Sequence, residues 1–220
     1  MLPMPRLFDL HEAVTTVNAE GIAGAFVECG VWNGGAVGLM GLADRRCPGP
    51  ERVIHLFDSF EGLPQPTEKD TDVYQGYLDE GHPEESSDAL RAIGACRGEG
   101  AVTVQTFLTN HVGIPRDQLA FHVGWFQDTV PTAATALGPI AILRLDGDWY
   151  ESTKVCIENL YDLVVEGGFL VIDDYGTFTG CREAIDAFFK ERGEAPDFIH
   201  SDDMCVYLRK PRVTYGKSIN

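Results

Sequence analysis

Four aspartates are the residues of this chain best suited to chemistry. Asp146 and Asp148 follow one short apolar run of residues, and Asp173 and Asp174 follow another. Carboxylate oxygens with no histidine or cysteine beside them suit Mg²⁺ or a similar hard cation rather than zinc. So many negative charges seldom lie together without a cation, and the sequence therefore predicts a metal site.

Each aspartate pair closes what reads as a buried strand. The two runs are separated by a helix-length segment, Glu151 to Val165, which Gly167 and Gly168 follow. A strand–helix–strand unit places its two strands parallel in one sheet, with their C-terminal ends on the same side. Because ligands of open α/β sheets bind in the crevice outside those ends, we expect the four carboxylates to meet there.

The rest of the chain repeats this alternation of strands and helices. It predicts a single domain over residues 1–220, an α/β fold with a doubly wound, mostly parallel sheet and helices on both faces. Strands are expected at 24–30, 52–59, 119–124, 140–145, 168–172, 198–199 and 204–208. Helices are expected at 7–18, 36–43, 101–111, 131–137, 151–165 and 181–192, the last with Thr179 as its N-cap.

Residues 61–100 interrupt the alternation. The stretch is polar and rich in glycine, proline and acidic residues, and only Ser87 to Cys96 has a helical pattern. A loop-rich insertion of this length inside a compact domain is usually functional. A lid or an acceptor-binding flap is one interpretation, and disorder is the other.

The charge balance excludes some partners. Asp and Glu number 34 against 17 Lys and Arg, for a net charge of −17. Such a surface repels phosphate backbones and anionic lipid, so neither nucleic acid nor a membrane is expected as a partner, although acidity for solubility alone fits equally well. The six cysteines are scattered without zinc spacing, and no targeting or membrane-spanning segment is evident. A cytoplasmic protein with reduced thiols is the expectation.

A glycine-rich turn, Glu28-Cys-Gly-Val-Trp-Asn-Gly-Gly35, follows the first expected strand. Glycines let the backbone approach a nucleotide-like ligand at a helix N-terminus. The spacing is not G-x-G-x-x-G, which disfavours a nicotinamide dehydrogenase. Asp58, at the tip of the next strand, is suited to ribose hydroxyls. Acids at successive strand ends favour a nucleoside-type cofactor.

Together these motifs resemble the class I S-adenosylmethionine-dependent methyltransferases. More closely, the chain resembles the macrocin O-methyltransferase family, whose members methylate sugar hydroxyls of antibiotics with Mg²⁺. The segments that carry the resemblance are 26–35, 56–64, 124–131, 143–151 and 171–176, in the family's order along almost the whole chain. The resemblance implies a Rossmann-like sheet and an enzyme of antibiotic biosynthesis, dependent on S-adenosylmethionine and Mg²⁺, that methylates a sugar hydroxyl of a glycosylated natural product.

The resemblance also implies roles for individual residues. Those expected to line the cofactor, from its methionine end through the ribose to the adenine, are Glu28, Gly30, Gly34, Asp58, Ser59, Gln127 and Asp128. The expected metal ligands are Asp146, Asp173 and Asp174, with Asp148 as the general base. The expected partner is a small-molecule acceptor, a glycoside, and a homodimer is one candidate assembly. Asn33 departs from the arginine that many members of the family have.

Other interpretations fit parts of the pattern. A Mg²⁺-dependent phosphatase of the aspartate-nucleophile type also pairs acids, but it separates them more widely than the one helix expected here. A non-catalytic cofactor-binding protein with a methyltransferase fold is another, although the matched acids are all present. Single aspartates could instead cap helices or pair with Arg144 or Arg182, but capping does not explain the Asp173-Asp174 doublet.

Overall fold

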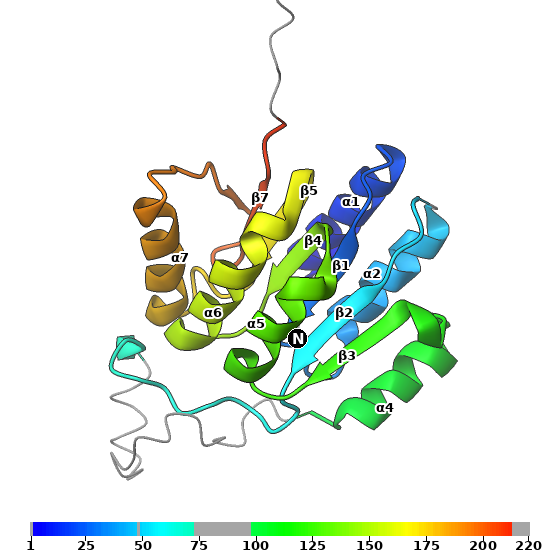
Figure 1. Ribbon diagram of the computed structural model, residues 1–220, viewed down its shortest axis with the longest axis horizontal. Coiled ribbons are helices and arrows are strands. Elements are labelled where there is room, and N and C mark those ends of the chain that lie inside the picture. Colours follow the sequence, from blue (N-terminus) through cyan, green and yellow to red (C-terminus); the bar gives the residue numbers. More distant parts are fainter. Residues whose placement is uncertain (1, 48, 73–97, 213–220) are drawn as a thin grey trace, which may run out of the picture.

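The computed structural model describes residues 2–47, 49–72 and 98–212 of the chain. A seven-stranded sheet runs through the molecule in the order β3-β2-β1-β4-β5-β7-β6 (Figure 1). Its strands are β1 (Ala25–Cys29), β2 (Ile54–Asp58), β3 (Leu119–Val123), β4 (Ile140–Leu145), β5 (Val164–Ile172), β6 (Ile199–His200) and β7 (Val206–Arg209). The first five pair in parallel, whereas β7 is antiparallel to both β5 and β6. The predicted doubly wound, mostly parallel α/β sheet is confirmed.

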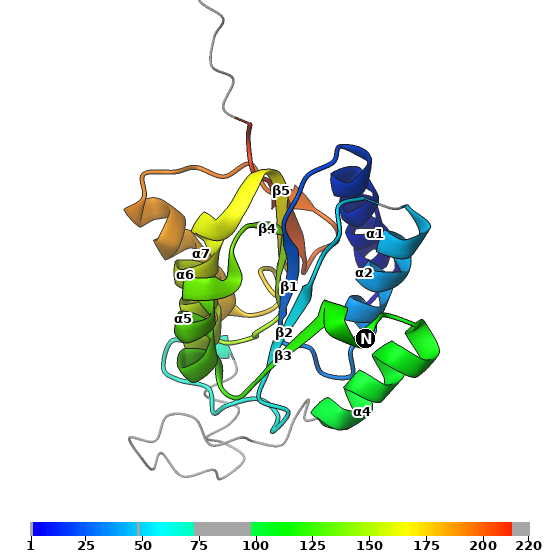
Figure 2. The same ribbon diagram turned by 45° about the vertical axis from the view of Figure 1, so that its right-hand side comes forward.

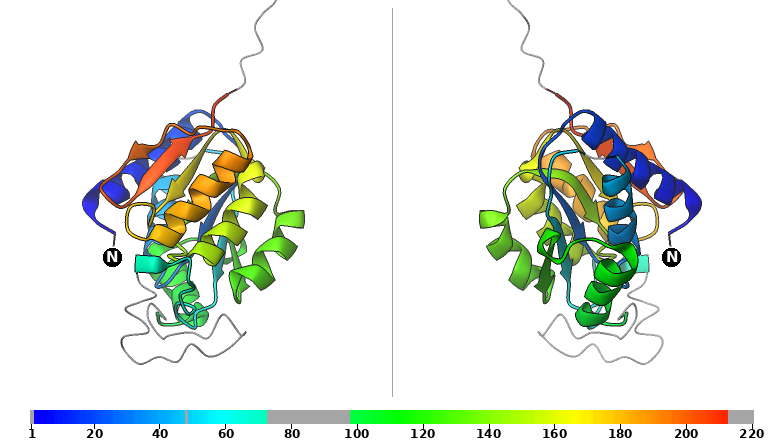
Figure 3. Two further views of the ribbon diagram at one scale, coloured as in Figure 1. Left: turned by 90° about the vertical axis from the view of Figure 1, so that its left-hand side faces the viewer. Right: turned by 90° about the vertical axis from the view of Figure 1, so that its right-hand side faces the viewer.

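Helices cover both faces of the sheet, as predicted (Figure 2). One layer holds α1 (Met4–Ala19), α2 (Gly35–Arg46) and α4 (Ala101–Thr106), which continues as a π-helical segment (Phe107–Val112). The other holds α5 (Phe126–Leu137), α6 (Tyr150–Leu160) and α7 (Thr179–Glu191), and Figure 3 shows each layer from its own side. Short 3₁₀ turns occupy Arg116–Gln118 and Tyr161–Leu163. None of the helices in the described ranges is long and apolar enough to cross a membrane.

The central strands lie between two hydrophobic cores. Every residue of β1 and of β4 is buried, and their side chains divide between one core under α1 and α2 and another under α5 to α7. Strands covered on both faces need apolar residues at successive positions rather than at alternate ones. This explains the continuous apolar runs that end at the acidic residues.

The boundary between α6 and β5 differs from the prediction. The helix ends at Leu160 rather than at Val165, and β5 begins at Val164, so that Gly167 and Gly168 lie inside the strand. At this point the pairing of β4 with β5 shifts register, and a Cβ atom on Gly168 would lie 2.8 Å from the Ala141 carbonyl oxygen. The glycines therefore mark an irregularity of the sheet where two backbones approach closely, not the end of a helix.

Residues 59–72, which we name the strap, follow β2 and dock on the N-termini of α6 and α7. Trp149 Nε1 donates to the Pro64 carbonyl at 2.7 Å, and the Tyr150 N–H donates to Asp70 Oδ1 at 2.7 Å. The strap is the described beginning of the predicted 61–100 insertion. Residues 73–97, which include the predicted helix at 87–96, lie outside the described part of the chain.

The predicted N-cap of α7 is wrong. Phe178 occupies that position, and Thr179 lies in the first turn of the helix. Asp72 of the strap accepts the Thr179 backbone N–H at 3.0 Å and its hydroxyl at 2.6 Å. A carboxylate more than one hundred residues away thus satisfies a helix terminus that local sequence rules assign to the threonine.

Replacing Asp70 with alanine is expected to lower the free energy of unfolding by about 2–4 kcal/mol, because buried donors would lose their acceptor. Asp70 is fully buried; its Oδ1 accepts from Tyr150, and its Oδ2 accepts from the backbone and the hydroxyl of Thr67. Chemical denaturation would measure the change. Asp162→Ala is the control, because its ion pair with Arg192 is exposed and contributes little. Equal stability losses in the two variants would contradict the role of Asp70.

Candidate active site

A cavity of about 750 Å³ opens at the C-terminal ends of the parallel strands, in the predicted crevice. The charged side chains that line it, among the residues the structure describes, are Arg6, Glu28, Asp58, Arg144, Asp146, Asp148, Asp173 and Asp174. Six carboxylates against two arginines leave four negative charges uncompensated when all are ionised. A partly buried excess of this size favours cationic ligands or protonated acids.

Arg144 lies at the centre of this charge. It is on β4, is 2% exposed, and is the register partner of Glu28 on β1. Its Nη1 donates to Glu28 at 2.6 Å and to Asp146 at 2.7 Å, and its Nη2 donates to Asp173 at 2.6 Å. Burial alone would lower the pKa of Arg144, but the three acids raise it well above its ordinary value. The guanidinium is therefore a permanent positive charge that holds three strand ends together.

From the sequence, Arg144 is expected only as an alternative partner for a single aspartate. The signal for a larger role is an arginine inside an otherwise apolar strand, Ile140–Leu145, next to a strand that carries a buried glutamate. Charged residues occupy such positions only when paired. This signal identifies a buried ion pair, but it does not reveal which acids take part.

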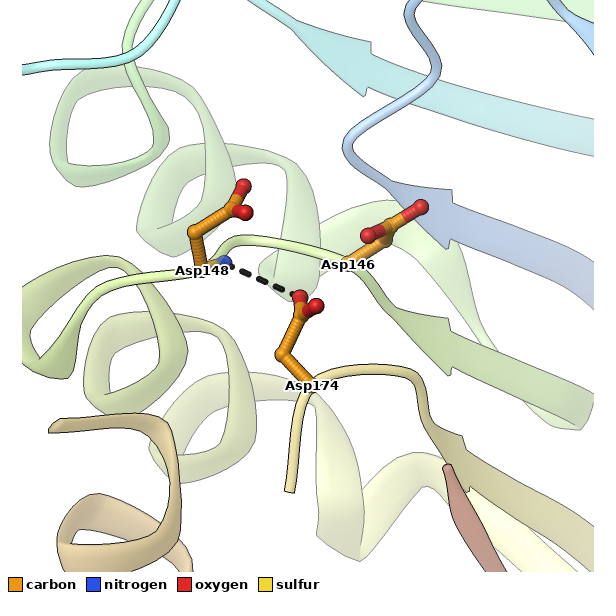
Figure 4. Close-up of side chains that lie close together, drawn as sticks. All are labelled: Asp146, Asp148 and Asp174. Carbon is orange, nitrogen blue, oxygen red and sulfur yellow. Dashed lines mark hydrogen bonds between the residues drawn. The ribbon is translucent and has the colours of Figure 1, made fainter. Parts of the chain in front are cut away.

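Asp146, Asp148 and Asp174 form a cluster in which one carboxylate oxygen from each lies within 4.8 Å of the others (Figure 4). The backbone N–H of Asp148 donates to Asp174 Oδ2 at 3.3 Å, which joins the turn after β4 to the end of β5. Burial, with repulsion from Asp146 next, raises the pKa of Asp148 to about 8 and that of Asp174 well above its usual range. An all-oxygen set of this kind fits Mg²⁺.

Asp173 lies outside this three-aspartate cluster. Its Oδ1 accepts from Arg144 at 2.6 Å, and its Oδ2 accepts from Arg6 of α1 at 2.8 Å. A carboxylate offers about four lone-pair sites, so each oxygen retains one for another partner. The role of Asp173 as a metal ligand stays a prediction. Nothing in the sequence marks Arg6, because it precedes the helix expected at 7–18 and its acidic partners are distant in the chain.

The first glycine-rich turn borders the cavity beside the aspartates. Glu28 is buried, and its Oε1 accepts from Arg144 while its Oε2 has no hydrogen-bond partner. Burial raises the pKa of Glu28 to about 8. Gly30 has a φ of 94°, and a Cβ there would lie 1.7 Å from the Asp146 carbonyl oxygen. Only glycine allows the turns after β1 and β4 to meet this closely.

Asp58 organises the same turn from β2. Its Oδ2 accepts the backbone N–H groups of Val31 at 2.7 Å and Trp32 at 2.8 Å, and its Oδ1 accepts that of Phe60 at 2.6 Å. Trp32 and Phe60, together with Asp148, are the non-glycine residues of the described chain with left-handed backbone conformations. Strained backbone of this kind persists where surrounding contacts enforce it, typically at functional sites. All three lie at the strand ends that border the cavity.

The structure brings most of the predicted residues to one cavity. Those that line it are Glu28, Gly30, Asp58, Ser59, Gln127, Asp146, Asp148, Asp173 and Asp174. Two predicted residues, Gly34 and Asp128, do not line the cavity. Gly34 is the N-cap of α2, where a Cβ would lie 2.9 Å from Val104, and Asp128 is exposed on the first turn of α5. Trp125 and Phe126 line the cavity beside Gln127.

The chain matches the family model of the macrocin O-methyltransferases (TylF) over residues 1–210. Over 211 residues it is 34% identical to the 8-demethyl-8-(2,3-dimethoxy-alpha-L-rhamnosyl)-tetracenomycin-C 4'-O-methyltransferase of Streptomyces olivaceus, covering 95% of this chain and 74% of that protein. It is 33% identical over 214 residues to the demethyldecarbamoylnovobiocin O-methyltransferase of Streptomyces niveus, covering 96% and 76%. The solved structure of the O-methyltransferase NovP has a TM-score of 0.77 and 30% identity, covering 95% of this chain and 81% of that one.

Mg²⁺ is expected to raise the melting temperature more at about pH 8.5 than at about pH 6.5. Asp148 has a folded pKa of about 8 against 3.8 for a free aspartate. Between pH 3.8 and about pH 8 the folded chain therefore binds more protons than the unfolded one. Its stability without a cation falls as the pH rises through this range. A bound cation stabilises the ionised carboxylates and removes this loss.

Differential scanning calorimetry with and without Mg²⁺ at both pH values would measure the effect. The variant Asp148→Asn, Asp174→Asn lacks two of the three clustered carboxylates and is the control in which the pH-dependent increase should shrink. An increase of equal size at both pH values in the wild-type protein would contradict the titration assigned to this cluster.

Proposed function

The chain belongs to the macrocin O-methyltransferase family and is therefore an O-methyltransferase, and we propose that its acceptor is a hydroxyl on the sugar of a glycosylated natural product. The name of the Streptomyces olivaceus relative specifies the 4'-oxygen of a rhamnosyl-tetracenomycin. The single observation that carries the proposal is the meeting of Asp146, Asp148 and Asp174 in one cavity with the glycine-rich turn after β1.

S-adenosylmethionine is the methyl donor of this family, and the cavity offers what it needs. Glu28 and Gly30 would hold its methionine end, where the unpartnered Glu28 Oε2 and the excess of carboxylates suit an ammonium and a sulfonium group. Asp58 and Ser59 would face the ribose, and Gln127 would lie by the adenine. The roles of Gly34 and Asp128 rest on the family resemblance alone.

Asp146, Asp173 and Asp174 would hold Mg²⁺. When bound, the ion supplies electrophilic stabilisation of the negative charge that develops on the acceptor oxygen. Asp146 and Asp174 belong to the three-aspartate cluster, and Asp173 would use the lone pairs that its arginine partners leave free. Arg144 and Arg6 then keep Asp173 in place.

Asp148 would act as the general base. A sugar hydroxyl is a weak nucleophile until its proton is removed, and Asp148, grouped with the proposed ligands Asp146 and Asp174, would be within reach to accept that proton. S-adenosylmethionine would supply the methyl group for attack by the hydroxyl oxygen, and the Asp148 carboxylate would accept the hydroxyl proton. The apolar side chains of Trp125, Phe126 and Phe178 in the wall would exclude water during the transfer.

Asp148→Asn is expected to lower methyl transfer by about 10²–10⁴-fold, because the general base is lost while the shape of the side chain is kept. Its affinities for S-adenosylmethionine and Mg²⁺ should stay near wild type in calorimetric titrations. Asp174→Asn is expected to lose Mg²⁺ affinity and turnover together. Asp186→Asn, whose partner is the Tyr175 hydroxyl outside the cavity, is the control that should change neither.

Two outcomes would count against these assignments. Unchanged turnover in Asp148→Asn would reject its role as the base. Loss of Mg²⁺ affinity in the same variant would instead make Asp148 a ligand, with Asp146 and Asp174, as the grouping of these three carboxylates allows.

A further inference from the structure

The cavity is also lined by residues that belong neither to the cofactor-binding turns nor to the three-aspartate cluster. Those turns follow β1 and β2, the cluster lies at the ends of β4 and β5, and β7 follows β5 in the sheet. Leu2, Arg6 and Leu7 come from the N-terminal segment. Thr177 and Phe178 come from the turn after β5, and Met204 comes from the turn before β7. With the cofactor over β1 and β2 and the reacting hydroxyl at the cluster, this part of the cavity is left for the rest of the acceptor.

Arg6 connects the N-terminal segment to two turns of this wall. It is 7% exposed, and its guanidinium donates to two carboxylates that are distant in the chain. Its Nη1 donates to Asp173 at 2.8 Å, at the end of β5, and its Nε donates to Asp202 at 2.7 Å, in the turn between β6 and β7. The planar guanidinium presents donors in a fixed geometry, so it sets the position of both partners.

Asp202 carries this constraint to the cavity wall. One of its oxygens, Oδ2, accepts from Arg6, while Oδ1 accepts the backbone N–H groups of Met204 at 2.9 Å and Cys205 at 2.8 Å. The carboxylate that Arg6 binds is therefore the one that folds the turn bearing Met204. Leu2 and Leu7, on either side of Arg6 in the sequence, line the same cavity as Met204.

We propose that Arg6 is a positioning residue for the acceptor: through Asp202 it holds Leu2 and Leu7 against the Met204 turn and so shapes the wall that contacts the aglycone. The inference rests on the proposed function, since it requires a glycoside whose sugar lies at the aspartates. The three side chains that Arg6 would position, those of Leu2, Leu7 and Met204, are apolar, which suits an apolar aglycone beyond the sugar. Arg6 itself does not contact the reacting atoms.

Asp202→Asn tests this directly. Asparagine keeps the Oδ1 acceptor for Met204 and Cys205 but replaces Oδ2 by an amide that cannot accept from Arg6. With 4-nitrophenyl rhamnoside as the acceptor, we expect KM to rise about tenfold with kcat near wild type, since a charge-assisted hydrogen bond is lost. With methyl rhamnoside, which lacks an apolar aglycone, KM should change little. The affinity for S-adenosylmethionine should stay the same with both acceptors.

Arg6→Met removes both ion pairs. It should raise KM for the aryl glycoside at least as much as Asp202→Asn and also lower kcat, because Asp173 is released too. Arg6→Lys should restore part of the wild-type KM and kcat, since an ammonium group keeps the positive charge but not the planar set of guanidinium donors. Arg52→Met is the control: Arg52 is also buried and bonded to Asn18 and Gly24, but it does not line the cavity. It should lower stability without raising KM.

The outcomes separate the inference from the proposed function. If wild-type enzyme methylates neither rhamnoside nor any other glycoside, the proposed function is wrong and the inference falls with it. If the wild type is active and Asp202→Asn leaves KM for the aryl glycoside within twofold, or raises KM equally for both acceptors, only the positioning role is rejected. Since Asp202→Asn is isosteric, it carries the test even if Arg6→Met fails to fold.

Discussion

The structure depends on one buried guanidinium among acids. Arg144 pairs with Glu28, Asp146 and Asp173, which lie at the ends of three adjacent strands. Without a positive charge among them, these carboxylates would repel one another more strongly. Burial raises the pKa values of Glu28 and Asp173 even beside Arg144, and those values would rise further without it. Arg144 and Arg6 together do not balance the six carboxylates of the cavity, however, and the remaining negative charge favours cationic ligands. The same group of charges thus supports the fold and suits the cationic cofactor and the metal ion that we propose.

The surrounding turns are held by hydrogen bonds that leave little freedom. Asp58 binds three backbone N–H groups of neighbouring turns, and Gly30 allows two strand ends to touch. The left-handed backbone of Trp32 is held by its hydrogen bond to Asp58, and that of Asp148 by its hydrogen bond to Asp174. Rigid turns of this kind suit methyl transfer, because the reaction depends on the alignment of the acceptor oxygen with the methyl group and needs no covalent enzyme intermediate.

Much of this was accessible from sequence, because apolar runs that end in acids specify both the strands and the edge where the acids meet. The doublet at the end of β5 is the instructive exception. Both residues lie in the turn that follows β5, and this turn directs Asp174 to the three-aspartate cluster while Asp173 faces the arginines. The doublet is visible in the sequence, but the identity of Arg6 as a partner is not, since Arg6 and Asp173 are 167 positions apart in the chain. Similarly, Thr179 has the chemistry of a cap, and only tertiary structure shows that Asp72 serves there instead.

The strap has a consequence for how enzymes of this type diversify. It supplies Leu63 and Pro64 to the cavity wall, and it also completes the N-termini of α6 and α7 through Asp70 and Asp72. A substitution that reshapes this side of the cavity therefore risks unfolding two helices. The turn that carries Met204 and the first turn of α1 are coupled to each other, because Arg6 of α1 binds Asp202 in that turn and Asp173 at the end of β5. Evolutionary change in substrate range should therefore alter these two segments together, and segments exchanged between related enzymes should be tolerated more readily when Arg6 and Asp202 are kept as a pair.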